Sequence, residues 1–166
     1  MTGKNDIALG VNGRTYRIRV EPRRTLADAL REDCGLMGTH IGCEHGVCGA
    51  CTVLIDGKPA RSCLMFAQQA QGYEIRTVEG LAQAGKLHAL QQAFIDNHGL
   101  QCGFCTPGFL MLGVGLLEAK PDVSDEEIRE VVSSNLCRCT GYQNILTAFR
   151  AAADAMKDGE ASGAQE

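Results

Sequence analysis

Hydrophobic and polar residues alternate through the first part of the chain, which is the pattern of β-strands that bury one face. The alternation runs over residues 7–11 and again over residues 16–20, and the Asn12-Gly13 pair between them favours a tight type I′ turn. This stretch therefore predicts a β-hairpin, followed by a short helix that Thr25 caps. Further strands are expected at residues 52–55, 61–64 and 73–78, with an Asp56-Gly57 turn after the first of them.

From about residue 80 onward, hydrophobic residues recur at intervals of three and four, which is typical of helices that pack by one face. Pro107 suits the first turn of a helix that runs to about Ala119, and Ser124 with Glu127 forms a capping box ahead of the next helix. Four helices with short connections predict a small bundle. The first and last of these helices have their hydrophobic positions at Leu87, Leu90, Phe94 and Ile95, and at Ile145, Leu146, Phe149, Ala152 and Ala153.

The chain thus divides into two parts with different secondary structure, and its charge balance becomes more acidic at the same point. Residues 1–80 are predicted to form a compact α+β domain, and residues 81–157 an all-α domain. Residues 158–166 lack a hydrophobic period and are predicted to be a disordered tail. A length of 166 residues leaves room for two small domains of this kind.

The composition adds one unusual feature, which is a count of nine cysteines. An odd number excludes complete disulfide pairing within the chain. The N-terminal residues contain no apolar signal segment, and the longest apolar run, over residues 109–117, is far shorter than the ~20 residues of a membrane span. We therefore expect a cytoplasmic protein whose thiols stay reduced, and so many reduced thiols indicate metal binding. The net charge of −4 argues against a nucleic-acid-binding protein.

Four of the cysteines, Cys43, Cys48, Cys51 and Cys63, have the spacing C-x4-C-x2-C-x11-C. A close triple with a distant fourth cysteine is the ligand pattern of plant-type [2Fe–2S] ferredoxins. Glycines between the cysteines allow the loop to curl, which turns backbone N–H groups toward negatively charged sulfurs. Structural zinc sites favour two short cysteine pairs instead. His45 lies in the same loop, but a Rieske centre needs two histidine ligands, so we interpret His45 as a loop residue.

Four others, Cys102, Cys105, Cys137 and Cys139, have the spacing C-x2-C-x31-C-x-C. Both pairs precede predicted helices, whose free N–H groups and positive dipole ends suit an anionic iron–sulfur–thiolate group. The spacing alone leaves tetrahedral zinc open as an alternative, whereas a cluster in the first part of the chain favours a second cluster and an electron path. The ninth cysteine, Cys34, is interpreted as a small buried hydrophobic residue.

Three stretches together carry a resemblance to a known family: GCEHGVCGACTV at 42–53, QCGFCTPG at 101–108 and NLCRCTGY at 135–142. On these motifs the chain, over about residues 5–157, resembles the two-[2Fe–2S] subunit, or N-terminal region, of the xanthine oxidase family of molybdenum hydroxylases. The resemblance implies a plant-ferredoxin-like β-grasp domain followed by an all-α four-helix-bundle domain, with one [2Fe–2S] cluster on each set of four cysteines. It also implies that Gln101 and Cys139 contact a molybdopterin cofactor held mainly by a large partner subunit.

The resemblance further implies an electron-transfer role inside a heterotrimeric oxidoreductase complex. Electrons would pass from molybdenum on the large subunit to the cluster of the helical domain, then to the other cluster, and then to FAD on a medium subunit. A dimer of this complex is also compatible with the resemblance. No nucleophile–base pair, dinucleotide loop or ATP loop is visible in the sequence, so substrate turnover is expected on a partner. The alternatives are a free-standing two-cluster ferredoxin and a zinc-bound interaction module.

Overall fold

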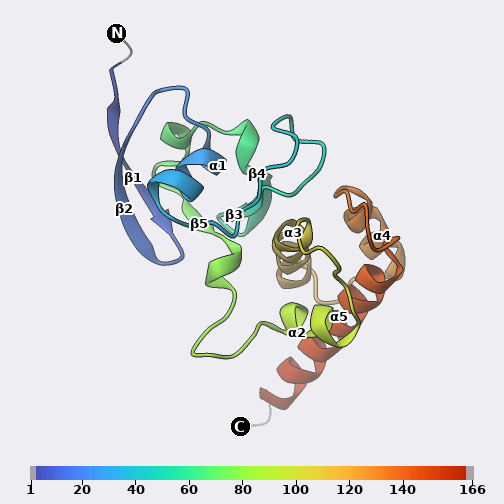
Figure 1. Ribbon diagram of the computed structural model, residues 1–166. Helices are drawn as coiled ribbons and strands as arrows, with labels where there is room; N and C mark the ends of the chain where they lie inside the picture. Colours follow the sequence, from blue (N-terminus) through green and yellow to red (C-terminus); the bar gives the residue numbers. More distant parts are fainter. Residues whose placement is uncertain (1–2, 164–166) are drawn as a thin grey trace.

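The computed structural model describes residues 3–163, in which a mixed β-sheet forms the N-terminal part and helices form the C-terminal part (Figure 1). The sheet has five strands in the order β2-β1-β5-β3-β4. Its strands are β1 (Asn5–Val11), β2 (Arg14–Val20), β3 (Thr52–Ile55), β4 (Lys58–Arg61) and β5 (Glu74–Arg76). β1 and β2 pair as the predicted hairpin, and β5 lies parallel to β1 and antiparallel to β3.

The strand expected at 61–64 starts and ends earlier than the sequence suggests. β4 stops at Arg61, and Ser62–Leu64 form a 3-10 turn, so Cys63 lies in a turn rather than on a strand. The hydroxyl and the N–H of Ser62 both donate to the carbonyl oxygen of Cys51, at 2.7 and 3.3 Å. These two bonds bend the chain out of the ladder and bring Cys63 back toward Cys51.

The strand expected at 73–78 is also shorter, because its end is tied to the hairpin turn. The N–H of Thr77 donates to the side-chain oxygen of Asn12 at 2.9 Å, and the Asn12 amide donates to the Thr77 hydroxyl at 2.8 Å. Asn12 and Gly13 have φ angles of 52° and 72°, as a type I′ turn requires. The turn therefore forms as predicted, and it also ends β5.

The short helix expected after Thr25 is present as α1 (Leu26–Asp28), which continues into a π-helical turn over Ala29–Asp33. Thr25 caps this helix as predicted, because its hydroxyl oxygen accepts an N–H of the first turn at 3.1 Å. Leu26 and Leu30 are fully buried. They share a core with sheet residues Ile7, Leu9, Val11, Val20, Val53 and Ile75.

Four helices follow in the described chain: α2 (Ala89–Asp96), α3 (Thr106–Ala119), α4 (Asp125–Ser133) and α5 (Gln143–Gly163). Pro107 lies in the first turn of α3 and Ser124 caps α4, both as predicted. Leu87 precedes α2, and both Leu87 and Ile95 are exposed, so these two hydrophobic positions do not join the core. α5 extends into the segment 158–166, for which disorder is expected, and the last three residues of that segment lie outside the described part.

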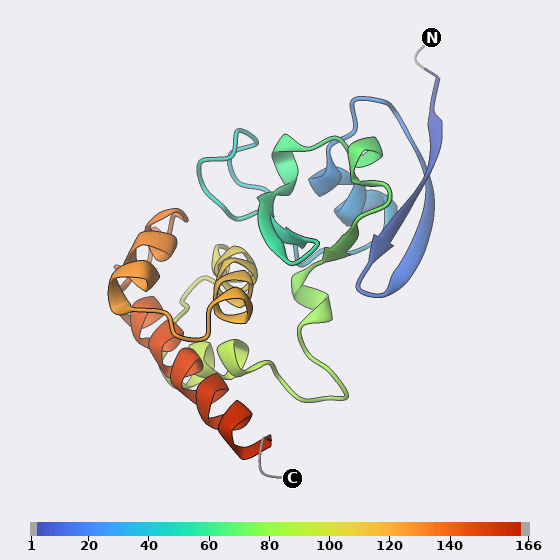
Figure 2. The same cartoon turned by 180° about the vertical axis from the view of Figure 1, so that it is seen from behind.

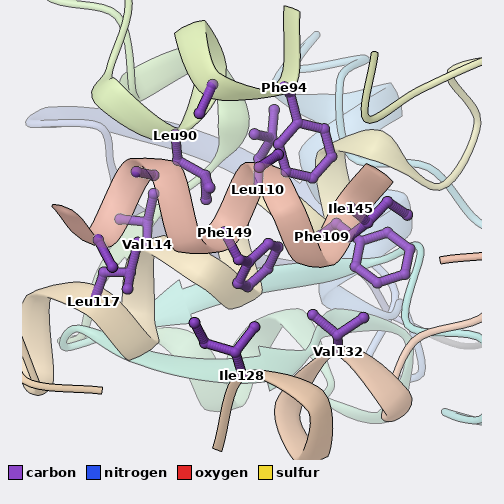
Figure 3. Close-up of a cluster of buried hydrophobic side chains, with 14 of the residues drawn as sticks. Leu90, Phe94, Phe109, Leu110, Val114, Leu117, Ile128, Val132, Ile145 and Phe149 are labelled. Atoms are coloured by element: carbon purple, nitrogen blue, oxygen red, sulfur yellow. The ribbon is translucent and has the colours of Figure 1, made fainter. Parts of the chain in front are cut away.

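The helices share one hydrophobic core, and α3 lies between the sheet and the other helices (Figures 1 and 2). The core includes Leu90, Phe94, Phe109, Val114, Leu117, Ile128, Val132, Ile145 and Phe149 (Figure 3). Leu54 of β3 belongs to the same core, and a Cβ at Gly115 of α3 would lie 2.9 Å from Leu54 and 2.7 Å from Pro59. α3 is therefore buried on two sides, which explains why its sequence is apolar all round.

The boundary between sheet and helices also carries an ion pair. Two nitrogens of Arg76, at the end of β5, contact the carboxylate of Glu118 in α3 at distances of 2.8 to 3.1 Å. The sheet and the helices are thus joined by packing and by charge, which gives the loops at their boundary a defined position. Within residues 3–163, no helix combines the length and hydropathy that a membrane crossing requires.

The capping box at the start of α4 makes part of the stability of the chain acid-sensitive. The Ser124 N–H and hydroxyl donate to the Glu127 carboxylate at 2.9 and 3.0 Å, and Lys120 pairs with the same group. The Lys120 contact, followed by the Ser124 donors, lowers the pKa of Glu127 from 4.5 to about 2. A carboxyl with a depressed pKa stabilises the fold above the unfolded pKa and loses this contribution as the pH falls through the folded pKa.

We expect Glu127→Gln to lose less thermal stability than the wild type between pH 4.5 and about 2, as measured by circular dichroism. Glu126→Gln is the matched control, because the Glu126 side chain is 83% exposed in the same helical turn. This control should keep the wild-type pH dependence. Identical pH dependence in the wild type and in Glu127→Gln would contradict the prediction.

Candidate metal centres

The first set of cysteines comes together beside β3 and β4. Cys43, Cys48 and Cys51 lie on the loop that leads into β3, and Cys63 lies in the turn after β4. Because β3 and β4 pair antiparallel, the start of β3 and the end of β4 meet. Cys51 and Cys63 share a small buried cluster. Burial raises the pKa of the Cys63 thiol to about 12, and the neighbouring Cys51 and Cys43 add to this rise.

The loop that carries these cysteines curls tightly, as its glycines predict. Gly46 and Gly49 have φ angles of 82° and 74°, in the left-handed region that favours glycine. At Gly46 a Cβ would come within 2.5 Å of Leu64, and at Gly42 it would lie 3.2 Å from the Cys48 sulfur. The absence of a side chain therefore lets Leu64 pack on Gly46 and leaves the Cys48 sulfur unobstructed at Gly42.

The curl also directs backbone N–H groups at the sulfur of Cys43. The Cys48 N–H donates to Cys43 Sγ at 3.4 Å. This bond, with the N–H groups of His45 and Val47, lowers the pKa of Cys43 to about 6. A low pKa favours the thiolate, which is the form that binds metal. The His45 ring hydrogen-bonds the Cys43 carbonyl rather than a sulfur, which agrees with its interpretation as a loop residue.

The second set of cysteines forms two facing pairs between the helices. Cys105 is the residue before α3, with Cys102 just ahead of it, and Cys137 and Cys139 lie between α4 and α5. The sulfurs of Cys102 and Cys139 are 3.5 Å apart. Burial and then the neighbouring Cys137 raise the pKa of Cys105 to about 12. Cysteines that are far apart in the sequence are thus brought to one place.

Thr140 supplies the hydrogen-bond donors of the second site. Its hydroxyl and its N–H donate to the Cys137 sulfur at 3.1 and 3.5 Å. Burial raises the pKa of Cys137, but these donors and the Cys139 N–H outweigh the effect of burial, so the pKa is lowered overall. The donors come from the turn ahead of α5 rather than from the helix end, because α5 begins only at Gln143.

The arrangement of the thiols bears on the kind of metal group they could hold. Within residues 3–163, no group of three or more His, Cys, Asp or Glu side chains is placed to hold one metal ion. A [2Fe–2S] cluster divides its four thiolates between two irons, so its ligands need not converge on a single point. The paired sulfurs and the N–H and O–H donors to them fit such a cluster.

A short contact joins the two sites. The N–H of Leu136, the residue before Cys137, donates to the carbonyl of Cys48 at 2.9 Å. Next to it, the side-chain amide of Asn135 donates to the Gly49 carbonyl at 3.3 Å. Asn135 is only 1% exposed. A cysteine of the first site is therefore linked by one hydrogen bond to the residue beside a cysteine of the second.

Helix α3 and a pair of stacked rings make further contacts at the boundary between the two sites. A Cβ at Gly108 of α3 would lie 2.3 Å from the Gly49 carbonyl oxygen, so two stretches of backbone touch there. The rings of His40 and Phe104 stack with centroids 5.0 Å apart, and His40 Nδ1 hydrogen-bonds the Phe104 carbonyl at 2.8 Å. The sequence alone does not indicate these contacts, because they join residues far apart along the chain. The motifs signal two of the close approaches, through Gly49 and Gly108.

Gln101 and Cys139, for which the resemblance implies a molybdopterin contact, both lie on the surface. Cys102, which follows Gln101, faces Cys139, so the structure places both residues near one exposed edge of the second site. Their contact with molybdopterin stays a prediction. Cys34 belongs to neither site and is only partly buried, against the core of the sheet. Burial raises the pKa of its thiol to about 11.

The sheet part and the helical part thus each bear four cysteines gathered around one site. Residues 9–82 match the family described as a 2Fe-2S iron-sulfur cluster binding domain, and residues 77–150 match the [2Fe-2S] binding domain family. The two matches together span both cysteine sets.

Comparison with whole proteins identifies the family. The chain is 60% identical to caffeine dehydrogenase subunit gamma of Pseudomonas sp. (strain CBB1), over 87% of this chain and 88% of that protein. It is 47% identical to the nicotinate dehydrogenase small FeS subunit of Eubacterium barkeri, over 91% of this chain and 96% of the relative. A chain in the crystal structure of quinoline 2-oxidoreductase from Pseudomonas putida 86 aligns with a TM-score of 0.89 and 55% identity, over 95% of this chain and 98% of that one. The chain belongs to the small iron–sulfur subunits of the xanthine oxidase family of molybdenum hydroxylases, and it is an electron-transfer subunit of an oxidoreductase complex.

Proposed function

We propose that this chain holds one [2Fe–2S] cluster on each set of four cysteines and connects the two electronically within its complex. The first cluster would bind Cys43, Cys48, Cys51 and Cys63, and the second Cys102, Cys105, Cys137 and Cys139. When bound, such clusters supply one-electron transfer. The observation that carries the proposal is the 2.9 Å hydrogen bond from the Leu136 N–H to the Cys48 carbonyl, which joins the two sites. The chain itself favours the thiolates of Cys43 and Cys137 by N–H donation, and its hydrogen bonds between the sites hold them at a fixed separation.

We propose that the two sites face different partners. The exposed edge with Gln101, Cys102 and Cys139 would face a molybdopterin cofactor on a large subunit. The first site, beside the exposed side chains of Val47 and Leu64, would face FAD on a medium subunit. A complex of several different subunits is supported by relatives whose names mark them as a small subunit and as a subunit gamma, and a heterotrimer and a dimer of it are part of the proposal. A cytoplasmic location is part of the proposal, since free thiols must stay reduced to bind iron.

The finer description of the fold belongs to the same proposal. For residues 1–80, a plant-ferredoxin-like β-grasp domain is supported by a mixed sheet with one helix packed against it. For residues 81–157, a four-helix bundle is supported by the core that α2 to α5 share. The alternative, a free-standing ferredoxin, has less support, because the relatives are subunits of complexes and a plant-type ferredoxin needs only the first domain.

Iron and acid-labile sulfide analysis of the full chain, with EPR after reduction, tests the two-cluster assignment. We expect about four irons per chain and two distinguishable signals. Cys102→Ser should remove one signal and leave the other. Cys34→Ser is the matched control, because Cys34 lies outside both sites, and it should keep both signals. About two irons and a single signal in the wild type would contradict the assignment.

The partner assignment is tested on the complex purified from native extract. The chain should co-elute with a larger molybdopterin-containing chain and a flavin-containing chain. Elution of all of the protein at the mass of the chain alone, 17.7 kDa, would instead favour the free-standing ferredoxin.

A further inference from the structure

Arg61, at the end of β4, reaches three separate segments with one guanidinium group. Its Nε donates to the Gly46 carbonyl at 3.3 Å, inside the loop of the first site. A second nitrogen donates to the hydroxyl of Thr52, at the start of β3. The third nitrogen donates to the Ser134 carbonyl at 2.9 Å, at the end of α4. One side chain therefore connects β4, the cysteine loop, β3 and the helical part.

The three acceptors all lie next to segments that carry cysteines. Gly46 stands between the first two cysteines of the loop, Thr52 directly follows the third, and Ser134 leads into the pair of the second site. Within residues 3–163, no ion pair joins Arg61 to a carboxylate. Its positive charge is thus held by neutral oxygens beside a site built for an anionic group.

The Gly49 carbonyl extends this network across the boundary. It accepts the Thr52 hydroxyl at 2.6 Å and the Asn135 amide at 3.3 Å. Since Thr52 in turn accepts from Arg61, the chain of contacts runs from Arg61 through Thr52 and Gly49 to Asn135. Asn135 is buried, and its side-chain oxygen has no hydrogen-bond partner in the described part of the chain. The Asn135 side chain is thus held by close packing and by the one hydrogen bond that its amide donates to the Gly49 carbonyl.

We infer that Arg61 is a positioning residue that sets the separation of the two cysteine sites, with Asn135 completing the connection from the helical side. This inference rests on the proposed function, because the separation matters only if both sites hold clusters. A guanidinium presents several N–H donors in a rigid planar fork and can hold three acceptors at once. The ammonium of a lysine keeps the charge but lacks this fixed geometry, so geometry and charge can be tested separately.

The test uses the full chain loaded with both clusters, as wild type, Arg61→Lys, Arg61→Gln and Asn135→Ala. Lys58→Gln is the matched control, because it removes a positive charge from an exposed position on the same strand. Three quantities are measured: the magnetic splitting between the two reduced clusters in low-temperature EPR, the midpoint potential of each cluster, and the rate at which a chelator removes iron.

We expect the two Arg61 variants and Asn135→Ala to change the splitting and to speed iron loss several-fold, while Lys58→Gln keeps wild-type values. Only Arg61→Gln should also lower the potential of the first cluster, because the loss of a nearby cation disfavours the more negative, reduced form. The potential in Arg61→Lys should stay close to that of the wild type.

Three outcomes would overturn the inference. Wild-type splitting and iron retention in Arg61→Lys would show that the charge of Arg61 acts without its geometry. Wild-type splitting in Arg61→Gln would exclude the positioning role, and wild-type splitting in Asn135→Ala would do so if Arg61→Gln does not fold. A wild-type chain with only one cluster signal would overturn the proposed function itself, which is distinguishable because no variant is needed to see it.

Discussion

Replacing Gly49 with alanine is expected to cost about 2–5 kcal/mol of folding free energy and to lower the iron content of both sites. Gly49 has a φ of 74°, where a Cβ costs on the order of 1–2 kcal/mol. This Cβ would also lie 1.9 Å from the side-chain oxygen of Asn135. Neither residue can move away easily, because Asn135 is buried and the Gly49 carbonyl is held by Thr52. The clash would displace the segment that leads to Cys137 as well as the loop of the first site.

Gly57→Ala is the matched control for this substitution. Gly57 has a φ of 78° with nothing within 4 Å of its Cβ position, so alanine there adds backbone strain without a clash. In urea unfolding, Gly49→Ala should lose at least ~1 kcal/mol more than Gly57→Ala. Adding Asn135→Gly to Gly49→Ala should recover part of the loss. Equal losses in the two alanine variants would show that the contact with Asn135 contributes nothing.

Features that depend on neighbouring residues were predictable from the sequence. The hairpin turn at Asn12-Gly13 and the cap at Thr25 form as expected, because turn and capping preferences act within a few residues. The loop of the first site is similar, since its glycines allow the curl by themselves. The pairing of Cys102 with Cys139 at 3.5 Å is not local: the spacing grouped the four cysteines as one set, but it did not indicate which of them face each other.

Features that depend on distant residues were not predictable from the pattern. β4 ends at Arg61 because Ser62 bonds to the Cys51 carbonyl, which no period along the chain could show. α3 was expected to bury one face in a bundle, but it also packs on β3 at Leu54. The contact between Leu136 and Cys48 likewise joins two motifs that are each recognisable, yet neither motif reveals that they touch. Tertiary packing decides each of these features.

Phe149→Ala is expected to destabilise the chain by about 3–5 kcal/mol, which is a large fraction of the ~5–15 kcal/mol that holds a domain folded. Phe149 is fully buried in α5, and its ring lies 6.1 Å from that of Phe94 in α2 (Figure 3). It also fills the space over Gly113 of α3, where a Cβ would meet the ring at 2.7 Å. Alanine therefore leaves a cavity where three helices meet.

The destabilisation caused by Phe149→Ala should affect the second site before the first. Cys105 precedes α3, and Cys137 and Cys139 lie between α4 and α5, so the second site is positioned mainly by the helices that Phe149 holds together. The first site depends instead on the pairing of β3 with β4. On heating, the EPR signal that Cys102→Ser removes should therefore disappear first in Phe149→Ala. Ile95→Ala is the control, because Ile95 is 52% exposed, and it should change stability by less than ~0.5 kcal/mol. Simultaneous loss of both signals would instead mean that the packing of α3 on β3 makes the two parts unfold as one.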